Sequence, residues 1–371
     1  MSRLQSERSP SPPTVTPTTD VTSPSDSGGH AVTAGAAKIA GGVTLDLRGL
    51  DSIRVSGDRS TATIGTGLTW GEVYAELDSL GLTVAGGRVG EIGVGGRTVG
   101  GGVSYHSPRF GWTWPSPGFA SGSNNFGVVT RMDMAAFEQG PMLGGMFVHP
   151  IGTIDAQLEA LHRFNSANEY DTCASLITTV SYSSARGAAI TNSIDYTKAE
   201  ERPAVFESFL QIRSLHESLE LGTMAQAARE QASFLRKNRR QAIRHLRNVA
   251  WMISFEPLPP NIYYHAPDSN SIGFGNKPGA LMVTLLNPQW SHEGDDDFIE
   301  ETMRQLIAKI EADAKRLKGH DPFSYLNYAV PWQDPFAGYG SGSLERLKTR
   351  DKVDPEHLFT TQVPGGFKIP A

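Results

Sequence analysis

Glycines are the residues of this chain that say most about chemistry. The stretch from Gly81 to Gly102 has ten glycines among 22 residues. That is too dense for an ordinary helix or strand, because each glycine costs backbone entropy and packs no side chain. Three kinds of structure would use such bare backbone: a disordered linker, a cluster of tight turns, or a backbone cradle for a phosphate-bearing ligand. Apolar residues alternate with the glycines, among them Ile92, Val94 and Val99, which excludes the linker. A turn cluster and a cradle both remain open.

Several motifs with well-defined chemistry are absent from the sequence. No Gly-x-Gly-x-x-Gly frame occurs, since Thr98 stands where the third glycine would, and no glycine precedes Lys-Ser/Thr as in a phosphate loop. No histidine pair has zinc-ligand spacing, and no Gly-x-Ser-x-Gly elbow occurs. Cys173 is the single cysteine, which excludes an internal disulfide and a thiolate metal cluster. We therefore expect no Rossmann nicotinamide site, no P-loop and no metal site.

Composition and charge fit a soluble globular protein. A length of 371 residues predicts about two domains, and the formal net charge of −6 argues against nucleic acid as a partner. No run reaches the roughly 18 apolar residues of a membrane span, and the N-terminus lacks the apolar core of a signal peptide, so we expect the chain as written to be cytoplasmic. The row Arg236, Arg240 and Arg244 could hold phosphates, but the solvated face of an amphipathic helix is the simpler interpretation.

The elements before residue 141 are short. Residues 1–27 are rich in Ser, Thr, Pro and Asp and are predicted to be disordered, because they carry too few large apolar side chains to offset the entropy of ordering. Alternating patterns predict strands over 41–47, 52–55 and 61–67. A helix is predicted over 70–80, with Val73 and Leu77 on its buried face and Gly81 as its stop.

Longer helices and strands are predicted after residue 141. Ile154, Leu158 and Leu161 should form one buried helix face, and 175–182 should pair with 188–196 as strands. Further strands are predicted over 249–255 and 280–286. The strongest helix is 295–317, which has an acidic start, a basic end and one apolar face formed by Ile299, Met303, Leu306 and Ile310.

Several short motifs occur in a fixed order along the chain. Gly28-Gly29-His30 comes first, Gly93-Val-Gly-Gly96 leads to Gly100-Gly-Gly102, and Gly122-Ser-Asn-Asn-Phe-Gly-Val-Val129 follows. The tail contains Phe323-Ser-Tyr-Leu-Asn-Tyr-Ala329 and Val353-Asp-Pro. Taken in order, these motifs resemble the FAD-binding fold of the p-cresol methylhydroxylase and vanillyl-alcohol oxidase superfamily, and most closely its berberine-bridge-enzyme-like fungal branch.

The resemblance implies an α+β fold in which an FAD-binding domain joins a substrate domain, an antiparallel sheet covered by helices. The FAD-binding domain would span 28–140, the substrate domain 141–320, and a C-terminal segment over 321–371 would return to the first domain. Backbone N–H groups would cradle the FAD pyrophosphate. The implied cofactor-binding residues are Gly28, Gly29, His30, Gly93, Val94, Gly95, Gly96, Gly100, Gly101, Gly122, Asn125, Gly127, Val128 and Asn327.

His30 matches the histidine that such enzymes join covalently to the flavin. Relatives with a second link carry a cysteine where this chain has Val89, so only the histidine link is expected. Tyr325 and Tyr264 are the candidate catalytic residues; Tyr263 and His265, beside Tyr264, are further candidates for a base.

The implied function is FAD-dependent oxidation of a small alcohol, sugar or alkaloid-like substrate, with O2 reoxidising the flavin. Two departures from the family pattern favour an alternative, a non-catalytic truncated relative. The subdomain that usually precedes the Gly-Gly-His turn is missing, and residues 113–121 replace several strands that usually follow Trp112 or Trp114. A complete relative could be secreted.

Overall fold

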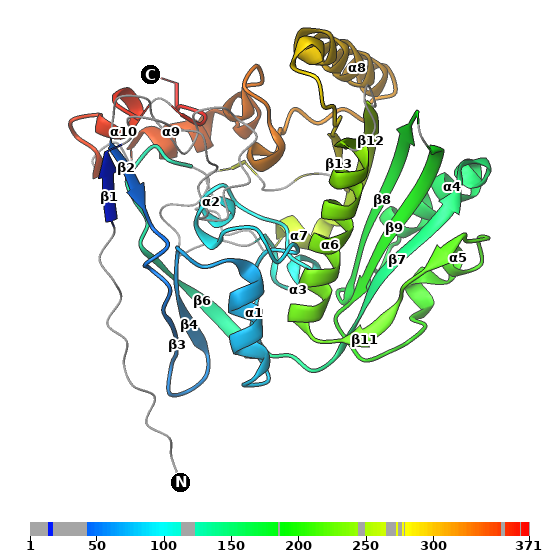
Figure 1. Cartoon of the computed structure of the whole chain (residues 1–371), viewed down its shortest axis with the longest axis horizontal. Helices are drawn as coiled ribbons and strands as arrows, with labels where there is room; N and C mark the ends of the chain where they lie inside the picture. The colour runs from blue at the N-terminus through cyan, green and yellow to red at the C-terminus, as the bar shows by residue number, and fades with distance from the viewer. Residues whose placement is uncertain are drawn as a thin grey trace.

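The structure is a computed structural model of the chain that describes residues 14–17, 43–112, 123–184, 186–243, 249–264, 272–273, 277, 279–349, 353–363 and 365–370. Within these residues the strands form a small sheet beside the glycine-rich stretch, a larger sheet beyond it, and a two-stranded ribbon (Figure 1). The predicted α+β class is confirmed.

The small sheet has the order β3-β4-β6-β5, with antiparallel neighbours throughout. Its strands are β3 (Ile53–Val55), β4 (Thr61–Gly65), β6 (Arg131–Glu138) and β5 (Leu82–Val84). Helix α1 (Trp70–Asp78) packs on this sheet through Trp70, Val73 and Leu77. The helix begins where the carboxylate of Glu72 accepts a hydrogen bond of 2.8 Å from the Thr69 N–H. The helix predicted over 70–80 is therefore confirmed, with an end two residues earlier.

A short ribbon corrects one expectation for the N-terminus. Strand β1 (Thr14–Pro17) pairs antiparallel with β2 (Val43–Asp46), although residues 1–27 were predicted to be disordered. Backbone pairing requires no large apolar side chain, which is why composition did not indicate this strand.

The larger sheet has seven strands, which run antiparallel in the order β10-β7-β9-β8-β12-β13, and β11 also pairs with β7. Their bounds are β7 (Met142–Pro150), β8 (Ala174–Ser183), β9 (Gly187–Tyr196), β10 (His216–Glu217), β11 (Glu220–Gly222), β12 (Ala250–Leu258) and β13 (Leu281–Leu286). The predicted pairing of 175–182 with 188–196 is confirmed by the β8–β9 ladder.

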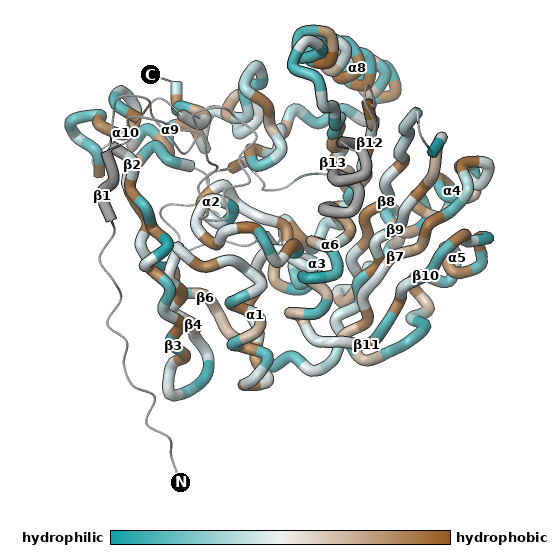
Figure 2. The backbone as a smooth tube through the Cα atoms, in the orientation of Figure 1, coloured by the Kyte–Doolittle hydropathy of each residue, from teal (hydrophilic) through white to brown (hydrophobic). Residues whose placement is uncertain are grey.

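One face of this sheet is covered by α4 (Ile154–Asn165) and α5 (Glu207–Leu210), where Leu161, Phe164 and Phe209 join a core with sheet residues (Figure 2). The predicted helix face is wrong at Leu158, which is 47% exposed, whereas Gln157 is buried. The amide of Asn192 on the sheet donates to Gln157 Oε1 at 2.8 Å, so a polar partner draws the glutamine inward.

Two long helices complete the larger domain. Helix α6 (Met224–Ile243) lies between α1 and the other face of the large sheet (Figure 1). Helix α8 (Asp296–Arg316) buries Ile299 and Met303, but Leu306 and Ile310 are 38% and 37% exposed. The predicted apolar face of α8 is thus covered over its first half, because the helix extends beyond the body of the protein.

The remaining helices are short. They are α2 (Val94–Val99), α3 (Ser107–Phe110), α7 (Pro260–Tyr264), α9 (Ser341–Thr349) and α10 (Leu358–Thr361), with 3-10 turns at Ile151–Thr153, Ala204–Phe206, Glu293–Asp295, Leu326–Tyr328 and Pro335–Tyr339.

The C-terminal residues return to the first domain, where the Asn125 amide donates to the Phe367 carbonyl at 2.9 Å. Within the described ranges, no helix is both long enough and apolar enough to cross a membrane.

Candidate functional site

The glycine-rich stretch folds as β5, a series of turns and the short helix α2, with Gly93 as the residue before the helix. The expectation that this stretch is too rich in glycine for a helix is wrong for residues 94–99. Val94 and Thr98 are buried, and the Val94 N–H donates to the Leu68 carbonyl at 2.9 Å. Tertiary packing therefore compensates for the low helix propensity of Gly95 and Gly96.

Close contacts within the protein, or a backbone conformation that favours glycine, explain most of the glycines in this stretch. A Cβ atom at Gly86 or Gly87 would collide with the Trp70 ring, and one at Gly100 would collide with the Asn327 amide. Gly101 adopts φ +73°, a conformation that favours glycine. The stretch is therefore a place where α1 and the C-terminal tail approach bare backbone closely.

Gly96 differs from these glycines. It is exposed, and a Cβ atom there would meet nothing within 4 Å. Protein packing therefore does not explain the glycine at this position. Exposed backbone at the start of a helix can donate N–H groups to a phosphate, so the cradle interpretation rests on this end of the stretch.

Two predicted site residues from the tail meet the glycine stretch. The Tyr325 hydroxyl donates to the Gly101 carbonyl at 3.1 Å, and the Asn327 amide donates to the Gly101 and Arg97 carbonyls at 2.5 and 3.1 Å. Burial raises the pKa of the Tyr325 phenol, and the positive charge of Arg97 offsets only part of that rise. Tyr325 therefore stays protonated and holds the tail against the stretch.

The second predicted motif lies beside the C-terminus. Asn125 is buried, and its side chain also accepts a hydrogen bond from the Ile369 N–H at 3.3 Å. Gly127 has φ +152°, and Val128 is 41% exposed. Asn125 holds the tail in place, and its role toward a cofactor stays a prediction.

Other predicted residues cannot be placed. Gly28, Gly29, His30, Gly122 and His265 lie outside the described residues. The backbone of Tyr264 belongs to α7, but its side chain is not among those described.

Tyr263 can be placed, and its position does not suit a base. Its side chain is buried in an apolar cluster, where its hydroxyl donates to the Gly279 carbonyl.

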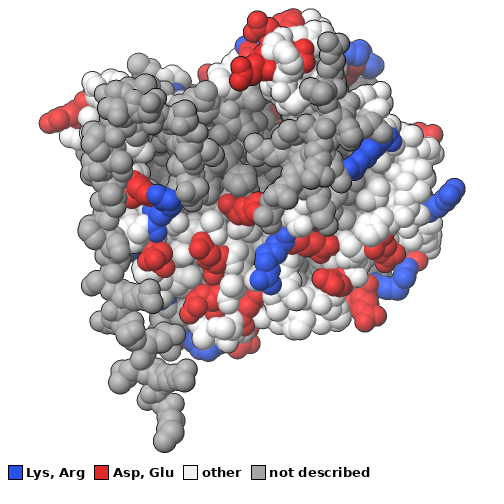
Figure 3. Space-filling view, viewed as in Figure 1, with Lys and Arg blue, Asp and Glu red and all other residues white. Residues whose placement is uncertain are grey.

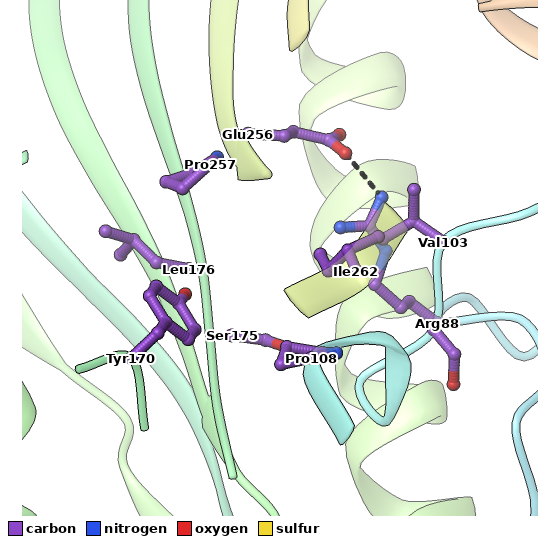
Figure 4. A pocket seen from close by; sticks show the side chains of 10 residues that line it. Arg88, Val103, Pro108, Tyr170, Ser175, Leu176, Glu256, Pro257 and Ile262 are labelled. Carbon is purple, nitrogen blue, oxygen red and sulfur yellow. Dashed lines mark hydrogen bonds and ion pairs between the residues drawn. The ribbon is translucent and has the colours of Figure 1, made fainter. Parts of the chain in front are cut away.

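A buried ion-pair cluster at the domain boundary was missed by the sequence reasoning (Figure 4). The Arg88 guanidinium lies 2.8 Å from Glu256 Oε2 and donates to the Tyr328 hydroxyl at 3.0 Å. The Tyr328 hydroxyl in turn donates to Glu256 Oε1 at 2.7 Å. Arg88 comes from the glycine stretch, Glu256 from β12 and Tyr328 from the tail, so three distant segments meet at one carboxylate.

The sequence does contain weak signals for this cluster. Tyr328 closes the Tyr-Leu-Asn-Tyr motif, and Glu256 is the single charged residue in the strand 250–258. A lone charge within an apolar strand usually has a buried partner, but nothing in the sequence identifies Arg88 as that partner.

A small pocket opens beside this cluster. It is lined by residues of both domains, namely Arg88, Val103, Ser104, Pro108, Tyr170, Ser175, Leu176, Glu256, Pro257 and Ile262. Ser175 donates to the Tyr105 carbonyl at 3.1 Å, which ties the large sheet to the glycine-rich side. The pocket therefore brings a carboxylate, a guanidinium and hydroxyl groups to one boundary.

Comparisons with known proteins identify the family. A family model described as an FAD binding domain matches residues 26–114. The FAD-dependent monooxygenase drtC of Aspergillus calidoustus is 30% identical over 92% of this chain and 76% of its own length. The chain belongs to this family of FAD-dependent oxidoreductases. A protein named Oligopeptidase PhomG' from Diaporthe leptostromiformis is 33% identical over 93% of the chain, but the chain spans only 31% of that relative.

Solved structures show the same fold as this chain. The 6-hydroxy-D-nicotine oxidase of Arthrobacter nicotinovorans superposes with a TM-score of 0.66 at 18% identity, covering 92% of this chain and 85% of that one. A berberine bridge enzyme variant superposes with a TM-score of 0.63 at 13% identity, covering 87% and 80%. The fold that the resemblance to the berberine-bridge-enzyme-like branch implied is confirmed.

The family comparison also indicates an internal difference in length. The alignment with drtC runs over 400 residues, more than the 371 residues of this chain, so drtC carries internal residues that this chain lacks. The matched FAD-binding region ends at residue 114, next to the segment predicted to be shortened.

The described part of the glycine stretch fits an FAD cofactor at one point. The open backbone at Gly96 can face a phosphate. The Arg97 guanidinium is turned inward, where it donates to the Val103 carbonyl and lies over the Trp70 ring. Among the described residues, no group of three or more His, Cys, Asp or Glu side chains is placed to hold a metal ion.

Burial sets the charge states around the pocket. Burial lowers the pKa of Arg88, but the Glu256 carboxylate outweighs this effect and raises it overall, so Arg88 stays charged. Burial and the Glu256 carboxylate together raise the pKa of Tyr328 well above its usual value. Burial also raises the pKa of Asp195, on the same face of the sheet, to about 8. The cluster of Arg88, Glu256 and Tyr328 therefore holds one cation, one hydrogen-bonded carboxylate and one neutral phenol.

Proposed function

We propose that this protein oxidises a small organic molecule with FAD as its cofactor and O2 as the final electron acceptor. The observation that carries the proposal is the cluster of Arg88, Glu256 and Tyr328 beside the glycine stretch. Bound FAD would supply the hydride acceptor for a C–H bond of the substrate. The protein must then remove a proton from the adjacent hydroxyl or amine, and the cluster offers a group for that step.

Glu256 is the proton acceptor in this proposal, and Tyr328 transfers the proton to it. The high pKa of Tyr328 makes a standing phenolate unfavourable. Its hydroxyl can nevertheless release its own proton to Glu256 Oε1, 2.7 Å away, as it takes one from the substrate. Arg88 holds the carboxylate and the phenol oxygen in position. The earlier candidate, Tyr325, donates to a backbone carbonyl instead.

The backbone of residues 93–96 and the amide of Asn327 would hold the cofactor. His30 would form one covalent link to it, and Val89 excludes a cysteine link at the usual position. The substrate class is an alcohol, sugar or alkaloid-like molecule on the family resemblance alone.

A second candidate is a non-catalytic relative that keeps the substrate domain without a complete flavin site. The length difference from drtC supports this alternative, because strands missing from the FAD-binding domain would expose sheet edges and apolar surface beside the cofactor.

The visible spectrum of the purified chain distinguishes these two functions. The enzyme should be yellow, and colour kept in the pellet after acid precipitation would support the covalent link. His30→Ala should move that colour to the supernatant, whereas His162→Ala, on the exposed side of α4, should not. A folded but colourless protein, judged by circular dichroism, would refute the enzyme proposal.

The proton-transfer role needs a separate variant. Tyr328→Phe should keep the bound flavin but slow flavin bleaching by an oxidisable alcohol by roughly 10²–10⁴-fold, the usual contribution of a positioned proton-transfer group. Tyr182→Phe, 54% exposed on β8, is the matched control. Equal bleaching rates in the two variants would remove Tyr328 from the mechanism.

A further inference from the structure

A chain of polar side chains is buried between α4 and the face of the large sheet that this helix covers. Thr178 Oγ1 donates to Asn192 Oδ1 at 2.8 Å, and the Asn192 amide donates to Gln157 Oε1 at 2.8 Å. His149 shares this face, because Phe147, directly opposite Asn192, stacks on it with ring centroids 5.8 Å apart. The four polar residues are at most 1% exposed. A histidine therefore lies in a layer that solvent does not reach.

The His149 ring is held in one neutral tautomer. Its Nδ1 lies 3.0 Å from the Arg213 carbonyl oxygen. A carbonyl only accepts hydrogen bonds, so Nδ1 carries the proton and Nε2 carries a lone pair. In the part of the chain that the structure describes, the buried Nε2 has no hydrogen-bond partner, and neither has the buried amide nitrogen of Gln157. An amide nitrogen only donates. The unpaired group that α4 contributes to the layer therefore suits a neutral imidazole and opposes a protonated one.

No charged side chain among the described residues offsets a positive charge on this ring. Burial lowers the pKa of His149, and the hydrogen bond to the Arg213 carbonyl offsets only part of that effect. Charged side chains gather instead on the outer surface over α5 and β10 (Figure 3). Those on the elements around the ring are exposed, namely Asp155, Glu159, His162, Arg163, Glu207, Arg213, His216 and Glu217.

The other titratable groups near this layer do not face His149. Asp195 on β9 leaves the opposite face of the sheet, because its neighbour Ile194 belongs to the core under α4. Tyr196 shares the face of His149 but lies at the other end of β7, opposite Leu143, where its hydroxyl donates to Asp171 at 3.0 Å. The same end of the layer contains Tyr170 and Cys173.

The His149 ring also fastens a connecting segment to the sheet. Residues 211–215 join α5 to β10. They are held by the bond from His149 Nδ1 and by a bond of 2.7 Å from the Leu215 N–H to the Val148 carbonyl. The apolar core of this face lies beneath α4 and α5. Loss of the His149 bond would therefore loosen the cover of an apolar surface.

We propose that His149 is an acid-sensitive latch, which holds α4 and residues 211–215 on the large sheet while the ring is neutral and releases them when the ring is protonated. A second ring N–H would have no acceptor within the described layer, and an unpaired charge there is unfavourable. Opening lets water hydrate the charged ring. Because the ring binds protons more readily in the open form, the open fraction should rise as pH falls through about 6.5, the ordinary pKa of histidine. The latch requires neither the cofactor nor the proposed enzyme activity.

Hydrogen exchange of the purified full chain tests the latch. Protection factors, which are corrected for the intrinsic exchange rate at each pH, are compared at pH 7.5 and pH 5 for peptides from α4 and residues 207–215. We expect these factors to fall by up to about thirtyfold, the ratio of open populations for a ring that titrates at about 6.5 when open and stays neutral when closed. Helix α1 in the first domain should keep its protection.

Two variants assign the effect to one ring. His149→Asn keeps an N–H for the Arg213 carbonyl but cannot take up a proton, so the protection of its α4 should no longer depend on pH. His162→Asn, exposed on α4, is the matched control and should keep the fall.

The unaltered chain judges the inference even if His149→Asn fails to fold. Equal protection of α4 at the two pH values would overturn the latch, and so would an equal fall in α1, which would indicate global unfolding. A fall that survives in folded His149→Asn would overturn it as well.

Discussion

Replacing Arg88 by methionine would leave the carboxylate of Glu256 buried without its cation. The two side chains of this ion pair are only 12% and 5% exposed. Removing one partner of a buried pair usually destabilises a protein by about 3–5 kcal/mol, because the remaining charge stays desolvated. Tyr328 would also lose the hydrogen bond from Arg88, worth about 1 kcal/mol. A total of about 4–6 kcal/mol is a large share of a typical stability of roughly 5–15 kcal/mol.

Urea unfolding at pH 7 measures this loss, and a double-mutant cycle isolates the pair. Glu256→Gln in the Arg88→Met background removes the uncompensated charge, so the double variant should be at least about 1 kcal/mol more stable than the sum of the single effects predicts. The deficit of Arg88→Met should be smaller at pH 5 than at pH 8, because an uncompensated buried carboxylate takes up a proton at low pH.

Arg163→Met is the matched control for the Arg88 cycle. Arg163 pairs with Glu159 on α4, but these side chains are 65% and 63% exposed, and such surface pairs contribute about 0–1 kcal/mol. Two results would contradict this reasoning: Arg88→Met being no more destabilising than Arg163→Met, or additive stability effects of Arg88→Met and Glu256→Gln. Either would mean that the Arg88–Glu256 ion pair does not stabilise the contact between the domains.

Two further predictions concern single residues. Burial raises the pKa of Asp195 to about 8. Between about pH 4 and 8 this carboxyl is therefore protonated in the folded chain and ionised in the unfolded chain. The free energy of unfolding should fall as pH rises through that window, by at most on the order of 5 kcal/mol. Asp195→Asn should flatten this slope in urea melts at pH 5, 6.5 and 8, and an unchanged slope would contradict the assignment. Gly100→Ala should lower the melting temperature, because its Cβ would meet the Asn327 amide, with a loss of about 1–3 kcal/mol. Gly96→Ala should keep or raise the melting temperature but reduce bound flavin, and a flavin content equal to that of the unaltered protein would remove the cradle role of Gly96.

Local patterns predicted the long elements well. The apolar spacing of Val73 and Leu77 identified α1, and the β8–β9 pair followed from alternation. Both signals lie within one segment, where periodicity reports which side is buried. The pattern did not predict that Gln157 replaces Leu158 in the core, because the hydrogen bond from Asn192 comes from another strand.

The site was predictable only in part. Tyr325 and Asn327 were identified through their motif, and the structure brings them to the glycine stretch. The partnership of Arg88 with Glu256 depends on two residues 168 positions apart, and no local rule connects them. The exposed end of α8 was missed for a similar reason, since the sequence shows an apolar face but not where the covering surface stops.

The contacts of the glycine stretch also determine when it can fold. Asn327 and Gly101, which are hydrogen-bonded, are 226 residues apart, so this part of the first domain is completed by a segment made last. During synthesis, domains usually fold from the N-terminus onward. Here the end of the stretch, around Gly100 and Gly101, cannot complete its contacts until the C-terminal tail has left the ribosome and closed a loop of more than two hundred residues. A chain released before Tyr325 would therefore carry a folded large sheet beside an unfinished first domain.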